Sequence, residues 1–242
     1  MRRITVAGAA ASLLVVAALG ACGRSSRPAE TTSETAAKPG LPPLDTGPPA
    51  RLKVVALGDS ITAGLGVFQG EAYPALLQAK LEAEGYAWEV VNAGESGDTS
   101  ATALRRVDWL LDPNVRVLIV AVGGNDALRA IPPKSTHGNI AGIIDKALAK
   151  GVEVLLAGME APPNLGEDYV VAFRNTFSSL RREYPGIKVL PFLLEGVAGN
   201  PSLNQADGIH PTVAGQQIIA DQLYELLKPM VDDIANRSSG GS

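Results

Sequence analysis

Two patterns of apolar and polar positions alternate between residues 51 and 235. Short apolar runs predict five strands, at Val54–Leu57, Glu89–Val91, Val115–Val122, Val152–Met159 and Val189–Leu190. Longer amphipathic runs predict five helices, at Tyr73–Glu84, Thr99–Leu111, Asn139–Lys150, Tyr169–Tyr184 and Pro211–Val231. This alternation of strand and helix predicts an α/β domain with helices on both faces of the sheet.

The strand-exit segments are where this architecture places its ligand sites. Val115–Val122 is apolar almost throughout, as is typical of a strand buried on both faces in a parallel sheet. Ligands of such sheets bind beyond the carboxyl ends of the strands. Four segments there carry polar residues and glycines: Gly58-Asp59-Ser60, Ser96-Gly97-Asp98-Thr99-Ser100, Gly123-Gly124-Asn125-Asp126 and Asp207-Gly208-Ile209-His210-Pro211.

The first 21 residues form a separate segment. A basic start, Met1-Arg2-Arg3, precedes an uncharged stretch from Ile4 to Ala21, as in a signal peptide. The stretch is also barely long enough to serve as an uncleaved membrane anchor. Leu19-Gly20-Ala21-Cys22 resembles the lipobox of bacterial lipoproteins, in which the cysteine is lipidated and becomes the first residue. We therefore expect residues 1–21 to be a lipoprotein signal peptide and Cys22 to carry a lipid; the alternative is an incidental cysteine.

Composition limits the remaining possibilities. Residues 22–50 are rich in Pro, Ser and Thr and predict a flexible tether, whereas residues 51–235 form one domain and residues 236–242 a disordered tail. Removing residues 1–21 takes away two of the 21 basic residues and none of the 25 acidic residues, which leaves a net charge of −6. That charge argues against a nucleic-acid partner. Cys22 is the single cysteine, which argues against a cysteine nucleophile or a cysteine metal site in the domain.

Ser60 has one good candidate for a base. A serine hydroxyl is a weak nucleophile without a base beside it, and histidine is the usual base near neutral pH. The chain has two histidines. We expect His137 to be a surface residue in a loop before a helix. His210 follows Asp207 by three residues and directly precedes Pro211, the expected first residue of the last helix. Asp207 could therefore orient His210 towards a serine, or the two residues could simply cap that helix.

Two further segments could donate hydrogen bonds to an oxyanion. The side-chain amide of Asn125 follows the most apolar strand, and the backbone amide of Gly97 lies just before a helix, where the helix dipole would reinforce it. The simpler interpretations are a turn capped by Asn125 or Asp126 and a helix capped by Asp98 or Thr99. Each segment taken alone favours its simpler interpretation.

Taken in order, the four segments resemble the SGNH, or GDSL-type, hydrolase family. The blocks are GDSI at 58–61, NAGESGDTS at 92–100, GGND at 123–126 and DGIHP at 207–211. The resemblance covers about residues 52–230 and is greatest to the bacterial thioesterase, lysophospholipase and arylesterase branch. It implies a flavodoxin-like three-layer α/β/α sandwich with five parallel strands, and it implies no metal or organic cofactor.

The resemblance also implies a role for each site residue. Ser60 is the nucleophile, His210 the general base and then acid, and Asp207 the residue that orients His210. The backbone amides of Ser60 and Gly97 and the side chain of Asn125 form the oxyanion hole. The chain lacks the G-x-S-x-G elbow of ordinary α/β-hydrolases.

The expected activity is hydrolysis of carboxylic esters or thioesters through an acyl-enzyme. Candidate substrates are lysophospholipids and short-to-medium acyl esters. We expect the protein to be a monomer and an exported lipoprotein, located on the periplasmic or other extracytoplasmic face of a membrane. Leu128 and Ile131, in an apolar loop after Asn125, and Glu160, where a neutral or basic residue is expected, are candidate substrate-binding residues. A carbohydrate or peptidoglycan O-acetylesterase is the first alternative, although only 5% of the chain is aromatic. A non-catalytic ligand-binding lipoprotein is the second.

Overall fold

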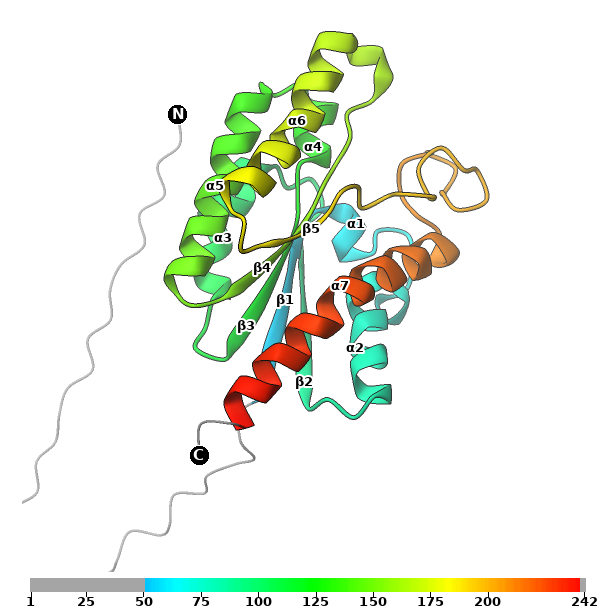
Figure 1. Ribbon diagram of the computed structural model, residues 1–242. Helices are drawn as coiled ribbons and strands as arrows, with labels where there is room; N and C mark the ends of the chain where they lie inside the picture. The colour runs from blue at the N-terminus through cyan, green and yellow to red at the C-terminus, as the bar shows by residue number, and fades with distance from the viewer. Residues whose placement is uncertain (1–50, 240–242) are drawn as a thin grey trace, which may run out of the picture. The chain divides into compact units, whose positions relative to one another are not determined.

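A computed structural model describes residues 51–239 of the chain. The segments predicted as signal peptide and tether, with Cys22, lie outside the described residues. Five strands form one parallel sheet (Figure 1). They are β1 (Leu52–Gly58), β2 (Trp88–Gly94), β3 (Val115–Ala121), β4 (Glu153–Ala157) and β5 (Lys188–Leu190), and they lie in the order β2-β1-β3-β4-β5. Each predicted strand corresponds to one of them.

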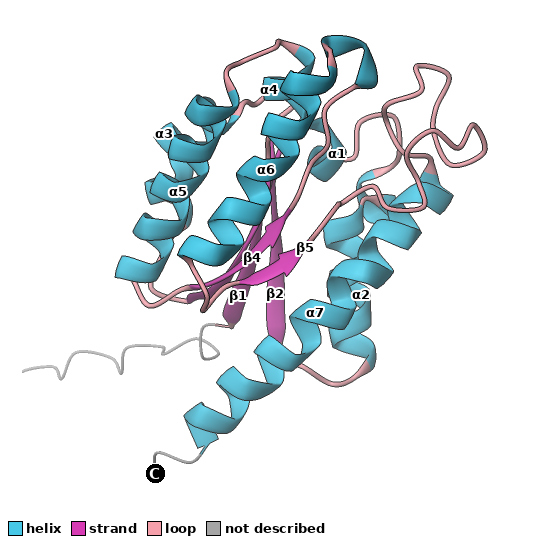
Figure 2. Cartoon of the chain, turned by 45° about the horizontal axis from the view of Figure 1, so that its top comes forward, coloured by secondary structure: helices cyan, strands magenta, loops and turns pink. Residues whose placement is uncertain are grey.

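Helices cover both faces of this sheet. One face carries α3 (Ser100–Leu110), α5 (Pro133–Ala149) and α6 (Glu167–Glu183), and the other carries α2 (Tyr73–Ala83) and α7 (Val213–Ser239), as Figures 1 and 2 show. Two short helices, α1 (Ser60–Ala63) and α4 (Gly124–Leu128), and two 3₁₀ turns, Gln69–Glu71 and Pro163–Leu165, lie between the longer elements. The expected three-layer sandwich is confirmed.

The two central strands, β1 and β3, supply the middle of the core. Val54 to Leu57 and Val117 to Val122 are almost fully buried, because helices cover both faces of these strands. Aromatic and aliphatic side chains from the helices complete the core, among them Tyr73 of α2, Ile140 and Ile144 of α5, and Phe173 of α6. None of the helices between residues 51 and 239 has the length and apolar character that crossing a bilayer requires.

The site lies where the strand order reverses. β1 and β3 are neighbours in the sheet, but the chain leaves β1 towards α2 on one face and leaves β3 towards α5 on the other. Their two exit loops therefore diverge and open a crevice at the carboxyl edge of the sheet. Ser60 follows the end of β1 by two residues, and Asn125 follows the end of β3 by four.

Three sequence predictions need correction. The last helix begins at Val213 rather than Pro211, because Pro211 pairs with Asn204 in an antiparallel bridge. It also continues to Ser239, beyond the expected end of the domain at residue 235, and Arg237 in its last turns forms an ion pair with Glu153 of β4. That ion pair holds the last turns against the sheet, where the sequence predicted a disordered tail.

His137 is the third correction. Helix α5 begins at Pro133, since proline is well tolerated in the first turn of a helix, so His137 lies within the helix and not in a loop before it. Its side chain is 27% exposed, and its Nε2 lies 3.1 Å from Oε1 of Glu183 on α6. His137 is thus a partly buried contact between two helices, and it does not line the cavity described below.

Candidate active site

Ser60, His210 and Asp207 form a continuous chain of hydrogen bonds. The Oγ of Ser60 lies 2.9 Å from Nε2 of His210, and Nδ1 of His210 lies 2.7 Å from Oδ2 of Asp207. Ser60 is 150 residues from His210 in the sequence, so the fold and not local geometry creates this contact. The imidazole is mostly buried, with 15% of the side chain exposed, whereas 46% of the Asp207 side chain is exposed.

The loop around Asp207 is organised by that carboxylate. Its Oδ1 accepts hydrogen bonds from the backbone amides of Ile209 and His210, each at 3.0 Å. The hydrogen bond from His210 and these two amides lower the pKa of Asp207 to about 2. Asp207 is therefore ionised at neutral pH and can hold the imidazole with Nε2 towards Ser60. Because α7 begins three residues after His210, neither residue caps that helix.

Ser60 is held by the turn that ends β1. β1 ends at Gly58, and Ser60 is the first residue of α1. Asp59 caps this short helix by accepting a hydrogen bond from the backbone amide of Ile61 at 3.1 Å. Asp59 is only 2% exposed, and its burial raises its pKa to about 6. Asp59 was assigned no role from the sequence, although an aspartate directly before a helix is a recognisable capping signal.

Gly97 and Asn125 border the same cavity as Ser60 and His210. Gly97 has φ of +89°, a backbone conformation that favours glycine, and Thr99 caps α3 two residues later. Asn125 lies in the first turn of α4. Neither the backbone amide of Gly97 nor the side-chain amide of Asn125 donates a hydrogen bond to another described residue. Both donors are thus available to a ligand in the cavity.

The cavity has a volume of about 550 Å³. This is within the range of small-molecule sites. Apolar side chains make up most of its wall, including Leu65, Leu128, Met159, Phe192, Leu194 and Ile209. Two of the three expected substrate-binding residues, Leu128 and Glu160, line it. Ile131 does not line it. Its backbone amide donates a hydrogen bond to the carbonyl of Asp126, and its carbonyl accepts one from Tyr169.

Glu160 is neutralised at the edge of this cavity. Its carboxylate accepts two hydrogen bonds from the guanidinium of Arg174 on α6, at 3.0 and 3.2 Å. Both side chains are partly exposed, so solvent screens the pair and its contribution to stability is small. Its effect is on the cavity, where it replaces a bare negative charge with a paired one.

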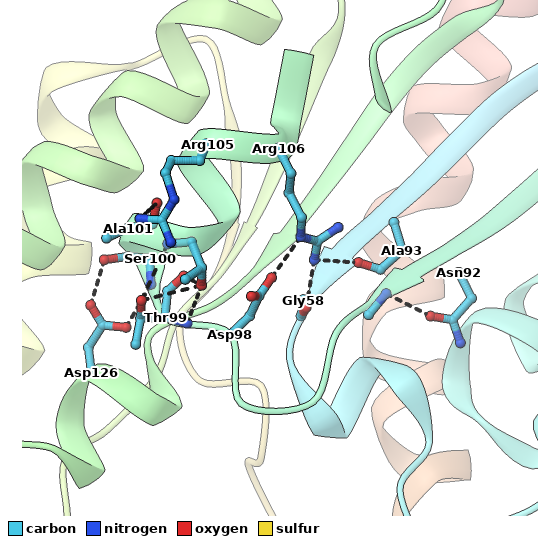
Figure 3. A network of polar contacts seen from close by, with 12 residues as sticks. Gly58, Asn92, Ala93, Asp98, Thr99, Ser100, Ala101, Arg105, Arg106 and Asp126 are labelled. Atoms are coloured by element: carbon cyan, nitrogen blue, oxygen red, sulfur yellow. Dashed lines mark hydrogen bonds and ion pairs between the residues drawn. The ribbon is translucent and has the colours of Figure 1, made fainter. Parts of the chain in front are cut away.

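Two polar residues for which the sequence predicted no part in the site, the buried Asp126 and the partly buried Arg106, support its loops (Figure 3). Asp126, which is fully buried beside Asn125, accepts hydrogen bonds from the backbone amide of Ser100 at 2.7 Å and from its hydroxyl at 2.5 Å. Arg106 of α3 bonds to Asp98 and to carbonyls of the two neighbouring strands. Asp126 belongs to the GGND block and Arg106 lies outside all four blocks, and the partners of both depend on tertiary contacts.

The described residues contain no group of three or more His, Cys, Asp or Glu side chains placed to hold a metal ion.

Comparison with known proteins identifies the family that the chain resembles. Residues 56–218 match the GDSL-like Lipase/Acylhydrolase family. Esterase TesA of Pseudomonas aeruginosa is 40% identical over 179 residues, covering 74% of this chain and 89% of that protein. Thioesterase 1/protease 1/lysophospholipase L1 of Escherichia coli K12 is 37% identical over 180 residues, covering 74% and 85%.

A solved structure agrees with both relatives. The psychrotrophic esterase EstA from Pseudoalteromonas sp., inhibited by monoethylphosphonate, superposes with a TM-score of 0.70 at 31% identity, over 74% of this chain and 98% of that one. The family match over residues 56–218 includes Ser60, Gly97, Asn125, Asp207 and His210. On its fold, its cavity and these relatives, the chain belongs to the GDSL-like lipase/acylhydrolase family.

Proposed function

We propose that this protein is a serine esterase that cleaves carboxylic esters or thioesters through an acyl-enzyme on Ser60. The observation that carries the proposal is the hydrogen-bonded chain from Ser60 through His210 to Asp207 at the wall of an apolar cavity. The names of the two relatives, an esterase and a thioesterase/lysophospholipase, support the same reaction class. A purely ligand-binding protein would have no need for this arrangement of nucleophile, base and orienting acid.

In the first half-reaction, the Oγ of Ser60 attacks the carbonyl carbon of the ester while Nε2 of His210 takes the hydroxyl proton. The carbonyl oxygen becomes an oxyanion, which accepts hydrogen bonds from the backbone amides of Ser60 and Gly97 and from the side chain of Asn125. Asp207 stabilises the imidazolium that forms. The tetrahedral intermediate then collapses, the bond to the leaving group breaks, and His210 returns its proton to the departing alcohol or thiol.

The second half-reaction repeats these steps with water. His210 takes a proton from the water that attacks the acyl-enzyme, and the same donors bind the second oxyanion. Collapse of this intermediate releases the carboxylic acid, and the proton on His210 returns to Ser60. Ser60 and His210 thus return to their starting protonation states before the next cycle.

The cavity wall favours an acyl chain over a sugar as the bound group. Its apolar side chains suit a hydrocarbon chain, and Phe192 is the one Phe, Tyr or Trp among the described residues that line it. A carbohydrate or peptidoglycan O-acetylesterase would be expected to present a broader aromatic platform. We therefore infer short-to-medium acyl esters and lysophospholipids as the substrate classes, with Leu128 and Glu160 among the residues that contact them.

A series of p-nitrophenyl esters from acetyl to dodecanoyl tests this proposal with the full chain. We expect kcat/KM to rise with chain length beyond acetyl, and we expect Ser60→Ala to abolish the activity. Activity restricted to acetyl esters, together with turnover of acetylated glycans, would favour the O-acetylesterase. A wild-type protein that is folded and cleaves none of the esters would remove the esterase assignment.

We propose separately that the protein is an exported bacterial lipoprotein anchored through Cys22. The proposal is supported by the basic start at Met1-Arg2-Arg3, the uncharged stretch from Ile4 to Ala21 and the Leu19-Gly20-Ala21-Cys22 sequence. An enzyme attached in this way would meet lipid esters at a membrane surface.

A further inference from the structure

The guanidinium of Arg106 joins three segments of the chain behind the active site. Its Nε donates to Oδ2 of Asp98 at 2.7 Å. Its Nη2 donates to the backbone carbonyl of Ala93 at 2.7 Å and to that of Gly58 at 3.1 Å. Figure 3 shows Arg106 extending from α3 to the last residues of β1 and β2 and to the loop between β2 and α3.

Two of these three partners, Gly58 and Asp98, lie close in the sequence to a donor of the proposed oxyanion hole. Gly58 precedes Ser60 by two residues, and Asp98 directly follows Gly97. The Gly58 carbonyl also accepts a hydrogen bond from the amide of Glu95 at 3.0 Å, so the loop before Gly97 is tied to the end of β1. The relative position of the Ser60 and Gly97 amides therefore depends on a small group of bonds in which Arg106 makes three.

Arg106 is suited to such a role because its bonds are charge-assisted and partly shielded from water. Its side chain is 22% exposed and that of Asp98 is 12% exposed. A planar guanidinium holds several acceptors at fixed angles, which a flexible ammonium does not. Arg105 offers a comparison: it is exposed, and the one hydrogen bond of its side chain to a described residue, at 3.3 Å, goes to the Ala101 carbonyl of its own helix.

We propose that Arg106 is a positioning residue for ester hydrolysis: it holds the Gly97 amide in register with the Ser60 amide, so that both donate to the oxyanion. The proposal rests on the serine-esterase function and deepens it. Arg106 does not line the cavity, so it acts through the backbone and not on the substrate. Its loss should weaken binding of the transition state while substrate binding is retained.

Kinetics of the full chain with p-nitrophenyl butyrate test the proposal, with Arg105→Met as the matched control. We expect Arg106→Met to lower kcat by about 10- to 100-fold with KM changed by no more than about twofold, since a misplaced donor costs transition-state stabilisation alone. Arg106→Lys should recover part of the loss, because an ammonium can still reach Asp98. Arg105→Met should leave both constants unchanged.

The affinity for a trifluoromethyl ketone inhibitor is a second measurement, and it would not change if Arg106 only stabilised the fold. Such ketones add to a serine and place a negative oxygen in the oxyanion hole, so they report on the donors directly. Arg106→Met should weaken this inhibitor by the same factor as kcat. Lys53→Met, which removes a partly buried ion pair with Asp112 at the other end of β1, should lower the melting temperature without weakening the inhibitor.

The possible results separate the two proposals. Wild-type kcat and inhibitor affinity in Arg106→Met would overturn the positioning role while leaving the esterase function standing. A wild-type protein without esterase activity would remove both. If Arg106→Met does not fold, Arg106→Lys and Asp98→Asn take its place, and an unchanged kcat in both would overturn the positioning role.

Discussion

At the scale of single residues, the donors to the oxyanion differ in how directly they can be tested. Ser60 and Gly97 offer backbone amides, which substitution does not remove. Asn125 offers a side-chain amide, and it lines the cavity without donating a hydrogen bond to another described residue. Asn125 is therefore the donor whose contribution can be measured by mutation.

We expect Asn125→Ala to lower kcat by about 10²–10³-fold, the usual cost of one lost oxyanion donor, with little loss of stability. Steady-state kinetics and thermal unfolding provide the measurement. Asn175→Ala, at an exposed position of α6, is the matched control and should change neither kcat nor stability. A kcat close to wild type would show that Asn125 is not a donor.

The raised pKa of Asp59 predicts how the free energy of unfolding depends on pH. Its pKa is raised to about 6 by burial, so the folded state binds a proton more tightly than the unfolded state does. Its contribution to stability is therefore present below about pH 4 and is lost as pH rises through about 6. Asp59→Asn keeps an oxygen that can cap α1 and carries no charge, so it should be more stable than wild type at pH 8, by up to about 3 kcal/mol.

Chemical denaturation of both proteins from pH 4 to pH 8 measures this difference. The advantage of Asp59→Asn should grow with pH and flatten above about pH 7. Asp207, whose pKa is about 2, titrates below this range and should not contribute to the change. A difference that is the same at every pH would contradict the raised pKa of Asp59.

The sequence was a good guide to which residues meet and a poor guide to what holds them. Ser60, Asp207 and His210 could be selected because each is a chemically distinctive residue in a strand-exit segment. Arg106 and Asp126 could not, because their value depends on carbonyls and amides that only the folded chain brings near. Ile131 was predicted to contact the substrate because it is apolar and close to Asn125 in the sequence, but it does not line the cavity.

At the scale of elements, the position of Ser60 depends on how closely α1 packs against β2. Gly94, the last residue of β2, lies so near to α1 that a Cβ there would be 2.2 Å from the backbone nitrogen of Ala63. Because the obstacle is backbone and not a flexible side chain, α1 or the end of β2 would have to move. The nucleophile is thereby tied to the edge strand as well as to β1.

Gly94→Ala should therefore destabilise the protein by about 1–3 kcal/mol, as overpacking does, and should lower kcat by displacing Ser60. Thermal unfolding and ester kinetics check both effects. Gly186→Ala is the matched control, because a Cβ at Gly186 meets nothing within 4 Å. Equal stability and activity in the two variants would contradict the close packing of α1 on β2.

Element boundaries were predictable where the apolar period was strong and failed where tertiary contacts decided. All five strands were identified because buried parallel strands are nearly continuous apolar runs. The start of α7 was misjudged because Pro211 pairs with Asn204, and its end because Arg237 bonds to β4. The start of α5 was placed six residues late, at Asn139, since Lys134 to Gly138 has no clear apolar face.

At the scale of the whole molecule, the proposed lipid anchor and the esterase domain are separated by a long segment. β1 begins at Leu52, 30 residues after Cys22. An extended segment of that length spans several tens of ångströms, at about 3.1 Å per residue. The proposed anchor would then keep the enzyme near a membrane without fixing its cavity against the surface.

We expect Cys22→Ser to abolish incorporation of a lipid label and to release or mislocalise the protein, while its esterase kinetics stay unchanged. Metabolic labelling with an alkyne fatty acid and fractionation of the membranes provide the measurement. Continued membrane attachment of the unlabelled variant would instead support an uncleaved anchor at residues 4–21.

The central claim is that Ser60 becomes acylated, and covalent capture tests it most directly. The full chain and its Ser60→Ala variant are treated with a fluorophosphonate probe, digested, and analysed by mass spectrometry for the labelled peptide. Our account predicts one modified peptide in the wild type, with the probe on Ser60, and no labelling of the variant. Equal labelling of the two proteins, or none of a wild type shown to be folded, would contradict it.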